Sequence, residues 1–496
     1  MKKILFTHSY FLRFDPKQWK LQQPYPPLGT LYAAAFIRNA GYHVRVFDTM
    51  FREDASQIEA ALISEVPDVL VIYDDGFNYL TKMCLTNMRE AAFRMIELAK
   101  ARGITVVVSG SDATDQSQKY LDAGADYILA GEGEQTLLEL LNSLPGDAAK
   151  QNHIHGLIRK SETGEQIKNP KREVVRHLDA LPHPAWDLLD INSYKTRWLN
   201  KHGYFSLNVS TTRGCPFHCN WCAKPIYGNR YNVHSPEWVI EEVKHLVRSF
   251  GASHLWMTDD IFGLKPGWVN SFADLVKNEK LTFRFKIQSR VDLLLEEDTI
   301  SALAASGCET IWVGAESGSQ KVLDAMDKGT EVGQIYTATQ LMKKAGIKPA
   351  FFLQFGYPGE TSADIRATIR MVKELLPDDI GISVSYPLPG TKFYERVKVD
   401  LQHKANWTDS DELAMMFHNT HPSSFYKELQ RYVHRTYRTR QGISEIRKLF
   451  SNPVKISLHQ LKRIAAIPVH ATGRFIHKQR LNKYSTEAIV SDGLVS

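Results

Sequence analysis

Residues 211–222 read Thr-Thr-Arg-Gly-Cys-Pro-Phe-His-Cys-Asn-Trp-Cys, which places Cys215, Cys219 and Cys222 on one short segment. The spacing is C-x3-C-x2-C, and no fourth cysteine stands nearby. Three thiolates at this spacing are able to hold three irons of a four-iron cluster and leave the fourth iron open to a small molecule. An open iron makes such a site catalytic rather than structural.

A structural zinc site is the alternative, with His218 or a distant residue as the fourth ligand. Zinc prefers four protein ligands in a closed tetrahedron, usually as two pairs, and the sequence offers no second pair. Disulfides are disfavoured because the chain is long, has only five cysteines and shows no secretion signal. The other two cysteines, Cys84 and Cys308, lie in apolar surroundings and are expected in the core.

The composition predicts a soluble protein of two or three domains. The chain has 496 residues, of which 43% are hydrophobic and 23% are charged. Its apolar runs are too short to cross a membrane, and residues 1–8 read as a first strand rather than a targeting signal. We therefore expect a cytoplasmic location, where thiolates stay reduced.

The net charge of +6 is modest, and its excess lies late in the sequence. A basic stretch between residues 427 and 480 is compatible with an anionic partner, such as a nucleic acid or a membrane surface, and equally with a solvated helical face. No recognised nucleic-acid motif accompanies it, so the solvated face is preferred and nucleic acid is not an expected partner. The basic residues include Arg431, Arg435, Arg438, Arg440, Arg447, Lys448, Lys462 and Arg463.

Residues 1–145 alternate short apolar segments with helical ones. Near-continuous apolar strands separated by helices imply a parallel sheet covered on both faces. We predict a doubly wound, Rossmann-like domain, whose ligands bind beyond the carboxyl ends of its strands. The expected strands are residues 3–7, 42–47, 69–73, 104–109 and 127–130.

The ends of these strands are rich in glycine and polar residues. Glycine there lets the backbone approach a large flat ligand, although each segment alone is also compatible with a tight turn. Two glutamates in the last segment suit the N-terminus of the helix that follows. The segments are Pro27-Leu28-Gly29-Thr30, Asp74-Asp75-Gly76-Phe77, Ser109-Gly110-Ser111 and Gly131-Glu132-Gly133-Glu134.

The rest of the chain divides into three parts. Residues 146–200 are polar and contain several prolines, which predicts a linker with short structure. Residues 201–395 resume the strand–helix alternation in about six units, which predicts a partial (β/α)6 barrel with active groups at the carboxyl ends of its strands. Residues 396–496 predict a C-terminal helical domain with the basic tail.

The cysteine segment resembles the signature of the radical S-adenosylmethionine (SAM) enzymes. Pro-Leu-Gly-Thr and Gly-Glu-Gly-Glu resemble the cobalamin-binding domain that precedes many of them. The domain order resembles the cobalamin-dependent radical SAM enzymes similar to the anaerobic magnesium-protoporphyrin IX monomethyl ester cyclase group. The resemblance implies a [4Fe-4S] cluster on the three cysteines, SAM, and cobalamin near Leu28, Gly29, Thr30, Ser109, Gly110, Gly131, Glu132, Gly133 and Glu134.

One departure from that pattern concerns the cobalt ligand. Cobalamin domains that supply a histidine use Asp-x-His-x-x-Gly after the first strand, whereas His8 follows Phe6 by two places and precedes Phe11 by three. A bound cobalamin would therefore lack a histidine beneath the cobalt, and His8 is expected to be an ordinary strand-end residue. Loss of cobalamin from this domain is the alternative.

Several polar residues at the predicted barrel strand ends match the needs of SAM, a cation with a ribose and an α-amino acid. The resemblance implies that Trp221 lies against the adenine. Gln288, Arg290 and Glu316 fit the remaining roles by type and placement, and Asp260 is the acidic residue expected to be catalytic on the substrate side. The plainer alternatives are core packing for the tryptophan and a helix cap or salt bridge for each acid.

The resemblance implies an enzyme that reductively cleaves SAM and acts on an unactivated carbon of a small molecule, as a methyltransferase or an oxidative cyclase. An electron donor such as flavodoxin or ferredoxin would be its partner. A cobalamin-binding sensor or carrier with a non-catalytic barrel and an RNA-modifying radical SAM enzyme are the alternatives. The substrate depends on the lining of the barrel, which no motif specifies.

Overall fold

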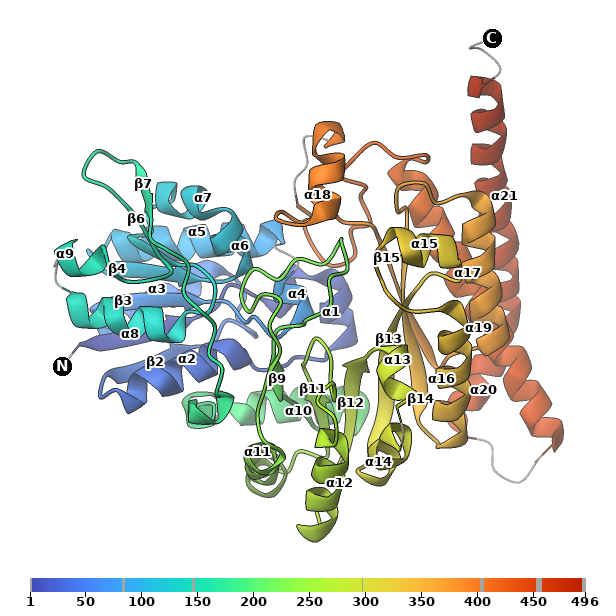
Figure 1. The fold of residues 1–496 in the computed structure, drawn as a ribbon, viewed down its shortest axis with the longest axis horizontal. Helices are drawn as coiled ribbons and strands as arrows, with labels where there is room; N and C mark the ends of the chain where they lie inside the picture. The colour runs from blue at the N-terminus through green and yellow to red at the C-terminus, as the bar shows by residue number, and fades with distance from the viewer. Residues whose placement is uncertain are drawn as a thin grey trace.

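The computed structural model describes residues 2–82, 85–144, 148–296, 298–401, 406–451 and 457–492. Two sheets lie one after the other along the molecule, with the N-terminal sheet at the left of Figure 1 and the C-terminal helices at the right. In the described ranges, we find no helix that is both long and apolar enough to span a bilayer. Cys84 and the expected domain boundary at residue 145 fall outside those ranges.

The first sheet has seven strands in the order β2-β1-β3-β4-β5-β6-β7. The first five pair in parallel, which confirms the predicted doubly wound sheet, and the last two add an antiparallel edge. That edge comes from the segment expected to be a linker. The strands are β1 (Lys3–Thr7), β2 (His43–Phe47), β3 (Val69–Tyr73), β4 (Thr105–Ser109), β5 (Tyr127–Leu129), β6 (Leu157–Lys160) and β7 (Gln166–Lys168).

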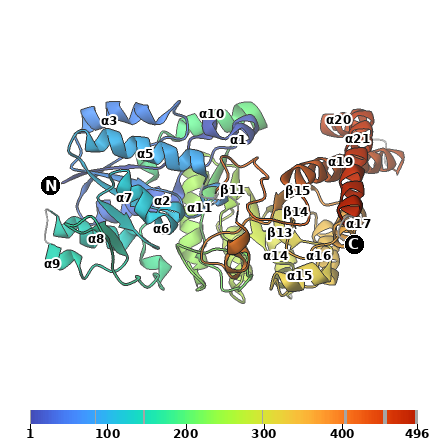
Figure 2. The same ribbon diagram turned by 90° about the horizontal axis from the view of Figure 1, so that it is seen from above.

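Helices cover both faces of this sheet, as Figure 2 shows. One face carries α2 (Leu28–Asn39) and α8 (Glu134–Ser143), and the other carries α3 (Ile58–Glu65), α5 (Thr86–Lys100) and α7 (Ser117–Asp122). The central strand β3 is buried along its whole length because both of its faces are covered. Shorter helices are α1 (Pro16–Leu21), α4 (Tyr79–Lys82), α6 (Ser111–Asp115), α9 (Ala148–Gln151) and α10 (Ile191–His202).

The strand order creates a topological switch point between β1 and β3, the neighbouring strands from which the chain winds in opposite directions. Open parallel sheets bind their ligands in the crevice outside the carboxyl ends of such strands. The residues that follow these two strands are His8 and Ser9 after β1, and Asp74 and Asp75 after β3. The fold therefore directs a ligand to this edge of the first sheet.

The second sheet has six parallel strands in the order β8-β11-β12-β13-β14-β15 and confirms the predicted partial barrel. A separate antiparallel pair, β9 (Thr212–Arg213) with β10 (Asn232–Val233), lies at the start of the cysteine segment. The barrel strands are β8 (Ser206–Val209), β11 (His254–Met257), β12 (Arg284–Ser289), β13 (Cys308–Glu316), β14 (Lys348–Phe355) and β15 (Asp379–Val384).

Helix α11 (Pro236–Phe250) illustrates how local sequence builds the outer layer of the barrel. Ser235 caps its N-terminus by accepting a hydrogen bond from Trp238, and Gly251 ends it in the left-handed conformation. Its buried face repeats every three or four residues and packs on the sheet. The other barrel helices are α12 (Trp268–Asn278), α13 (Val291–Leu294), α14 (Thr299–Ala305), α15 (Gln320–Ala325), α16 (Val332–Lys344), α17 (Ser362–Leu375) and α18 (Lys392–Val397).

Three helices form the predicted C-terminal helical region: α19 (Ser423–Ser451), α20 (Leu458–Ala465) and α21 (Ile467–Asp492). Helix α19 packs against α17 and β15, and α21 runs beside α19 at the right edge of Figure 1. The aromatic residues Trp407, Phe417, Phe425 and Tyr426 are buried in the barrel core. Cys308 is buried at the start of β13, as expected of a core cysteine.

A proline-rich segment of the first domain closes the β8 edge of the barrel. Trp198 Nε1 donates to the carbonyl of Pro24 at 2.8 Å, and Asn208 Nδ2 donates to the carbonyl of Pro26 at 2.9 Å. Between these anchors, the ring of Tyr25 lies 4.7 Å from that of Trp256 on β11. The two domains therefore share one continuous core.

Candidate cluster and cofactor site

The cysteine loop begins at the carboxyl edge of the barrel, where Asp259 after β11 holds its first residues. The backbone amides of Thr211 and Thr212 donate to Asp259 Oδ1 at 2.7 and 2.8 Å, and the Thr211 hydroxyl donates to Oδ2 at 2.6 Å. Burial raises the pKa of Asp259 to about 6 despite these hydrogen bonds. Asp259 is therefore fully engaged in positioning the loop.

The middle of the loop is fixed by Asn220, which lies between the second and third cysteines and is buried. Its side-chain amide donates to the carbonyl of Ala325 at 2.8 Å and accepts from the hydroxyl of Tyr357 at 2.8 Å. Its backbone amide donates to Met326 at 3.0 Å, and its carbonyl accepts from Phe393 at 2.9 Å. One asparagine thus ties the loop to the ends of α15, β14 and α18.

Replacing Asn220 with alanine is expected to lower the free energy of unfolding by about 2 kcal/mol, because its three side-chain hydrogen bonds, to Ala325, Asp327 and Tyr357, are lost. The variant should also retain less iron after anaerobic reconstitution. His218→Ala, in the exposed part of the same loop, should change stability by less than about 0.5 kcal/mol. Urea unfolding and iron content measure both variants, and equal behaviour of the two would contradict the anchoring role.

The three cysteines are free thiols of graded exposure: Cys215 is buried, Cys219 is half-buried and Cys222 is exposed. Among the residues that the structure describes, no three His, Cys, Asp or Glu side chains form a ready site for a metal ion. The donor set itself fits a [4Fe-4S] cluster, because three thiols lie on one anchored loop and each can bind a different iron. The loop opens toward the carboxyl end of the barrel, where the fold places reactive groups.

Glu316 lies at the end of β13 and forms a buried ion pair with Lys328, at 2.8 Å between Oε1 and Nζ. Its backbone has a φ of +52°, which is costly for a residue with a β-carbon and typical of functional positions. The Lys328 ammonium lies 6.0 Å from the ring centre of Trp221, whose buried indole N–H has no hydrogen-bond partner in the part of the chain that the structure describes. A carboxylate, an ammonium and a free indole donor beside the cysteine loop suit the polar groups of SAM.

Arg290 lies between β12 and the cysteine loop and is already engaged by protein groups. It donates to Asp292 and to the backbone carbonyls of Lys328 and Gly329, at 2.9 to 3.3 Å. Its guanidinium also lies 3.7 Å from the ring centre of Phe217. Gln288, two residues earlier, is half-buried at the end of β12. The roles of both residues toward SAM remain predictions.

The glycine-rich segments at the strand ends of the first domain pack closely against one another. The amide of Gly29 donates to Asp75 Oδ1 at 3.1 Å, and a β-carbon at Gly29 would lie 3.2 Å from the Asp75 backbone. A β-carbon at Gly133 would lie 2.9 Å from the hydroxyl of Ser109. The predicted cobalamin-contacting residues Leu28, Gly29, Thr30, Ser109, Gly110, Gly131, Glu132, Gly133 and Glu134 thus gather along one edge of the sheet.

Glu132 and Glu134 meet Arg213, which belongs to the cysteine segment of the second domain. The guanidinium donates to Glu132 and lies 2.9 Å from Glu134, and the three side chains are only 2 to 4% exposed. The rings of Tyr32, Phe77 and Tyr227 surround the guanidinium at 5.2 to 5.5 Å. Burial opposes the charge of Arg213, but Glu134, Tyr227 and Glu132 raise its pKa well above the usual range.

This buried bridge also offers a test of fit for cobalamin. One carboxylate oxygen of Glu134 and one guanidinium nitrogen of Arg213 are buried and have no hydrogen-bond partner among the described residues. Buried polar atoms are normally paired, so each of these two atoms could still take a polar partner. Amide side chains ring the corrin of cobalamin and supply both donors and acceptors. The residues present therefore fit this group at the edge of the first sheet.

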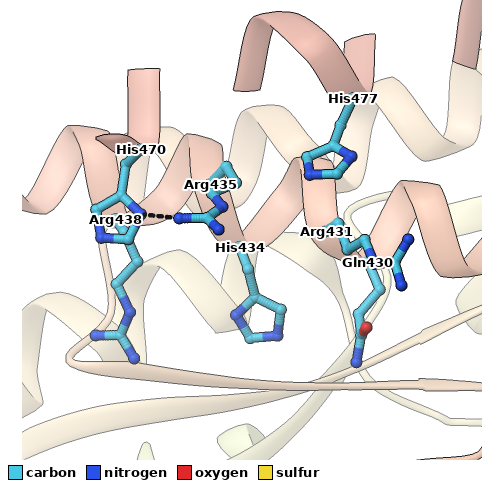
Figure 3. Close-up of a pocket in the computed structure, with 7 residues that line it drawn as sticks. All are labelled: Gln430, Arg431, His434, Arg435, Arg438, His470 and His477. Carbon is cyan, nitrogen blue, oxygen red and sulfur yellow. Dashed lines mark hydrogen bonds between the residues drawn. The ribbon is translucent and has the colours of Figure 1, made fainter. Parts of the chain in front are cut away.

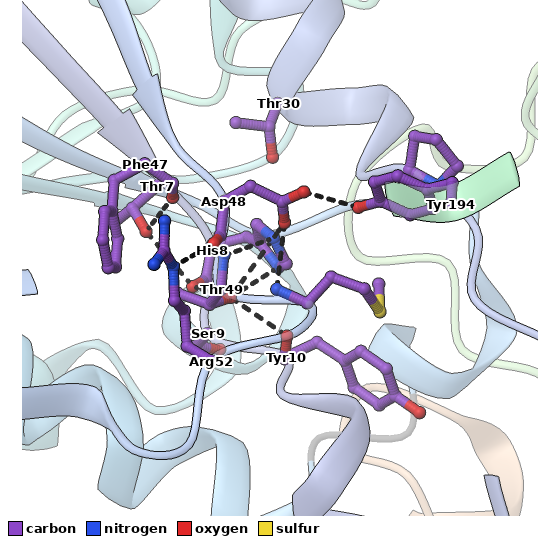
Figure 4. Close-up of polar contacts among 12 residues, drawn as sticks. Thr7, His8, Ser9, Tyr10, Thr30, Phe47, Asp48, Thr49, Arg52 and Tyr194 are labelled. Carbon is purple, nitrogen blue, oxygen red and sulfur yellow. Dashed lines mark hydrogen bonds and ion pairs between the residues drawn. The ribbon is translucent and has the colours of Figure 1, made fainter. Parts of the chain in front are cut away.

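His8 is engaged within its own domain, as Figure 4 shows. Its ring nitrogens lie 2.9 Å from Asp48 Oδ1 and 3.1 Å from the hydroxyl of Thr49, and the Tyr194 hydroxyl donates to Asp48 Oδ2 at 2.6 Å. Burial opposes the charge of Asp48, but these hydrogen bonds hold its pKa below the usual range. His8 thus behaves as the ordinary strand-end residue that the sequence predicts.

Asp260 forms an ion pair with Lys82 of the first domain, at 2.6 Å between Oδ1 and Nζ. Both side chains are partly exposed beside the cysteine loop. Sequence reasoning missed Lys82, Arg213 and Lys328, although each contacts a residue that it singled out. Arg213 alone carried a visible signal, since it stands two residues before Cys215.

Comparison with known protein families finds a match in each of the two sheet-containing parts of the chain. Residues 209–372 match the Radical SAM superfamily, and residues 20–141 match the B12 binding domain. The first match contains the cysteine loop and barrel strands β11 to β14, and the second contains strands β2 to β5 of the first sheet. The radical SAM domain implies a [4Fe-4S] cluster and SAM, and the B12-binding domain implies cobalamin.

Individual relatives extend over most of the chain. An uncharacterized methyltransferase of Pyrococcus horikoshii is 28% identical over 390 residues, which are 77% of this chain and 81% of the relative. The anaerobic magnesium-protoporphyrin IX monomethyl ester cyclase of Rubrivivax gelatinosus is 24% identical over 405 residues, 80% of this chain and 70% of the relative. The structure of the cobalamin-dependent SAM radical enzyme OxsB with aqua-cobalamin superposes with a TM-score of 0.74 at 16% identity, covering 96% of this chain and 72% of OxsB.

Proposed function

We propose that this chain, an enzyme that combines a B12-binding domain with a radical SAM domain, transfers a methyl group to an unactivated carbon of a small molecule. When bound, the cluster would supply the electron that cleaves one SAM to 5′-deoxyadenosine, and cobalamin would carry a methyl group taken from a second SAM, which leaves as S-adenosylhomocysteine. The protein's own part is to hold these groups, align the substrate between them and exclude water.

The observation that carries the proposal is that the carboxyl edges of the first sheet and of the barrel are joined at Arg213. The guanidinium precedes Cys215 by two residues and binds Glu132 and Glu134 at the cobalamin edge of the first sheet. This contact supports a single reaction space that both cofactors face. A methyl carrier and a radical source need such proximity, because productive geometry tolerates only small displacements.

The described side chains suggest a division of labour around this space. Cys215, Cys219 and Cys222 would hold the cluster, and Trp221 and Glu316 would orient SAM, with Lys328 holding the Glu316 carboxylate in place. Asp260, held by Lys82, would accept a proton on the substrate side. A reducing protein such as flavodoxin or ferredoxin is the proposed electron donor, and the cytoplasm is the proposed location.

Oxidative cyclisation is the second candidate, because the similarity to the Rubrivivax gelatinosus cyclase extends over 80% of the chain. It would use the same radical source but remove electrons from the substrate instead of adding a methyl group. The two reactions therefore differ in their SAM products, because only methyl transfer would also yield S-adenosylhomocysteine.

Product stoichiometry tests the proposal. The chain is reconstituted anaerobically with iron, sulfide, cobalamin and a reductant, and SAM products are measured with candidate substrates. Methyl transfer is expected to give equal amounts of 5′-deoxyadenosine and S-adenosylhomocysteine, whereas 5′-deoxyadenosine alone would favour oxidative chemistry. SAM cleavage that requires RNA would favour an RNA-modifying enzyme, and a loaded cluster with neither product would favour a sensor or carrier.

A further inference from the structure

A cavity of about 410 Å³ lies between α19 and α21, outside the cofactor site (Figure 3). Among the described residues, its lining contains three arginines and three histidines and no carboxylate. Helix α19 supplies positions one turn apart along one face, and α21 supplies two histidines seven residues apart, which also share a face. The residues are Arg431, His434, Arg435, Arg438, His470 and His477.

Nearby carboxylates neutralise only part of this charge. Glu428 lies 2.8 Å from Arg431 and 2.7 Å from His477, and Asp379 lies 3.3 Å from Arg438. Arg435 has a different partner, because its Nη1 donates to the ring nitrogen Nδ1 of His470 at 3.0 Å. That nitrogen must be unprotonated to accept, so the Arg435 charge faces a neutral group.

The remaining histidine adds donors without adding charge. Burial, together with the nearby charges of Arg438 and Lys17, lowers the pKa of His434 to about 4, so the imidazole is neutral near pH 7. A neutral imidazole still offers one N–H to a ligand oxygen. The cavity therefore presents guanidinium forks and ring N–H groups to whatever enters it.

We propose that this cavity binds a small ligand with a multiply charged phosphate group, such as a phosphate monoester or a diphosphate. Guanidinium forks match phosphate oxygens with two parallel hydrogen bonds, and more than one arginine favours more than one negative charge. The volume lies within the range of small-molecule sites. Three of the basic residues for which the sequence preferred a solvated face thus converge on one cavity.

A phosphate chain of nucleic acid fits the surroundings less well. The outer surface of α21 exposes Val469 and Phe475, which are 63% and 61% accessible, and apolar side chains do not suit a phosphate backbone. A cavity between two helices also encloses a single group rather than following an extended strand. The proposal is independent of cofactor loading, since no cysteine-loop residue lines the cavity.

Calorimetric titration of the full chain with pyrophosphate tests the site at 150 mM NaCl. Saturable one-to-one binding is expected, and Arg435→Gln should weaken it by about 10-fold or more. Arg435→Lys keeps the charge but loses the forked guanidinium, so its affinity for pyrophosphate should lie between that of the unsubstituted chain and that of Arg435→Gln. Arg474→Gln removes an exposed arginine of α21 outside the lining and should change the affinity by less than about 2-fold.

Three outcomes would overturn the proposal. The first is no saturable binding of pyrophosphate, and the second is an equal loss in Arg435→Gln and Arg474→Gln, which would indicate only diffuse surface charge. The third is tight binding of an oligoribonucleotide, or of phosphatidylglycerol vesicles, that pyrophosphate does not displace. Circular dichroism of Arg435→Lys and Arg435→Gln verifies that a loss of binding is not a loss of folding.

Discussion

The Cys219→Ala chain is expected to lose SAM cleavage by more than about 100-fold after anaerobic reconstitution. Residues that merely orient a metal ligand cost 10 to 100-fold when mutated, and removal of a ligand should cost more. Only three cysteines lie on the loop, so no spare thiol can replace Cys219. Iron and sulfide content and the yield of 5′-deoxyadenosine measure the effect.

Cys308→Ala provides the matched control, because it removes a thiol without touching the loop. Cys308 is buried at the start of β13, so its loss should cost about 1 kcal/mol of stability and leave iron content and SAM cleavage unchanged. A Cys219→Ala chain that kept a full cluster and full SAM cleavage would refute the role of the loop.

Arg213→Gln is expected to destabilise the chain by about 3–5 kcal/mol, because it leaves two buried glutamates without their cation. The effect should also reach cobalamin binding, since Glu132 and Glu134 lie at the edge where that cofactor is expected. Urea unfolding, cobalamin retention on gel filtration and limited proteolysis between the domains measure the three consequences.

Two further variants distinguish the loss of the contacts between Arg213 and the two glutamates from the loss of a positive charge alone. Arg230→Gln removes an exposed arginine of the same loop and should stay within about 0.5 kcal/mol of the unsubstituted chain. Adding Glu132→Gln and Glu134→Gln to Arg213→Gln should recover part of the lost stability, because the buried charges are then gone. If Arg213→Gln unfolded no earlier than Arg230→Gln, the bridge would have no structural role.

The parallel strands of both sheets were predictable because apolar runs alternate with helical segments in the sequence. The hairpin β6–β7 was not, since Leu157–Lys160 and Gln166–Lys168 form a short, partly exposed edge that carries polar and charged residues. Edge strands are often short and charged, so they resemble loops in sequence. The segment expected as a linker therefore contributes to a sheet.

The candidate site was predictable only where one motif contained its residues. The three cysteines and Trp221 lie within one stretch of eight residues, so their spacing is informative by itself. The partners of Arg213 lie about 80 residues earlier, and Lys328 meets Glu316 only because β13 and the turn after α15 bring them together. Such pairs depend on tertiary packing, which a single sequence does not display.

The proline-rich segment that closes the β8 edge has a consequence for how this protein can be divided. A radical SAM half that began at residue 201 would lack Tyr25, Trp198 and the carbonyls of Pro24 and Pro26, so apolar barrel residues would meet water. A chimera with the first domain of one related chain and the barrel of another would fail for the same reason, unless the proline-rich segment came from the same chain as the barrel. The barrel therefore needs residues from both sides of a cut at residue 201 to complete its core.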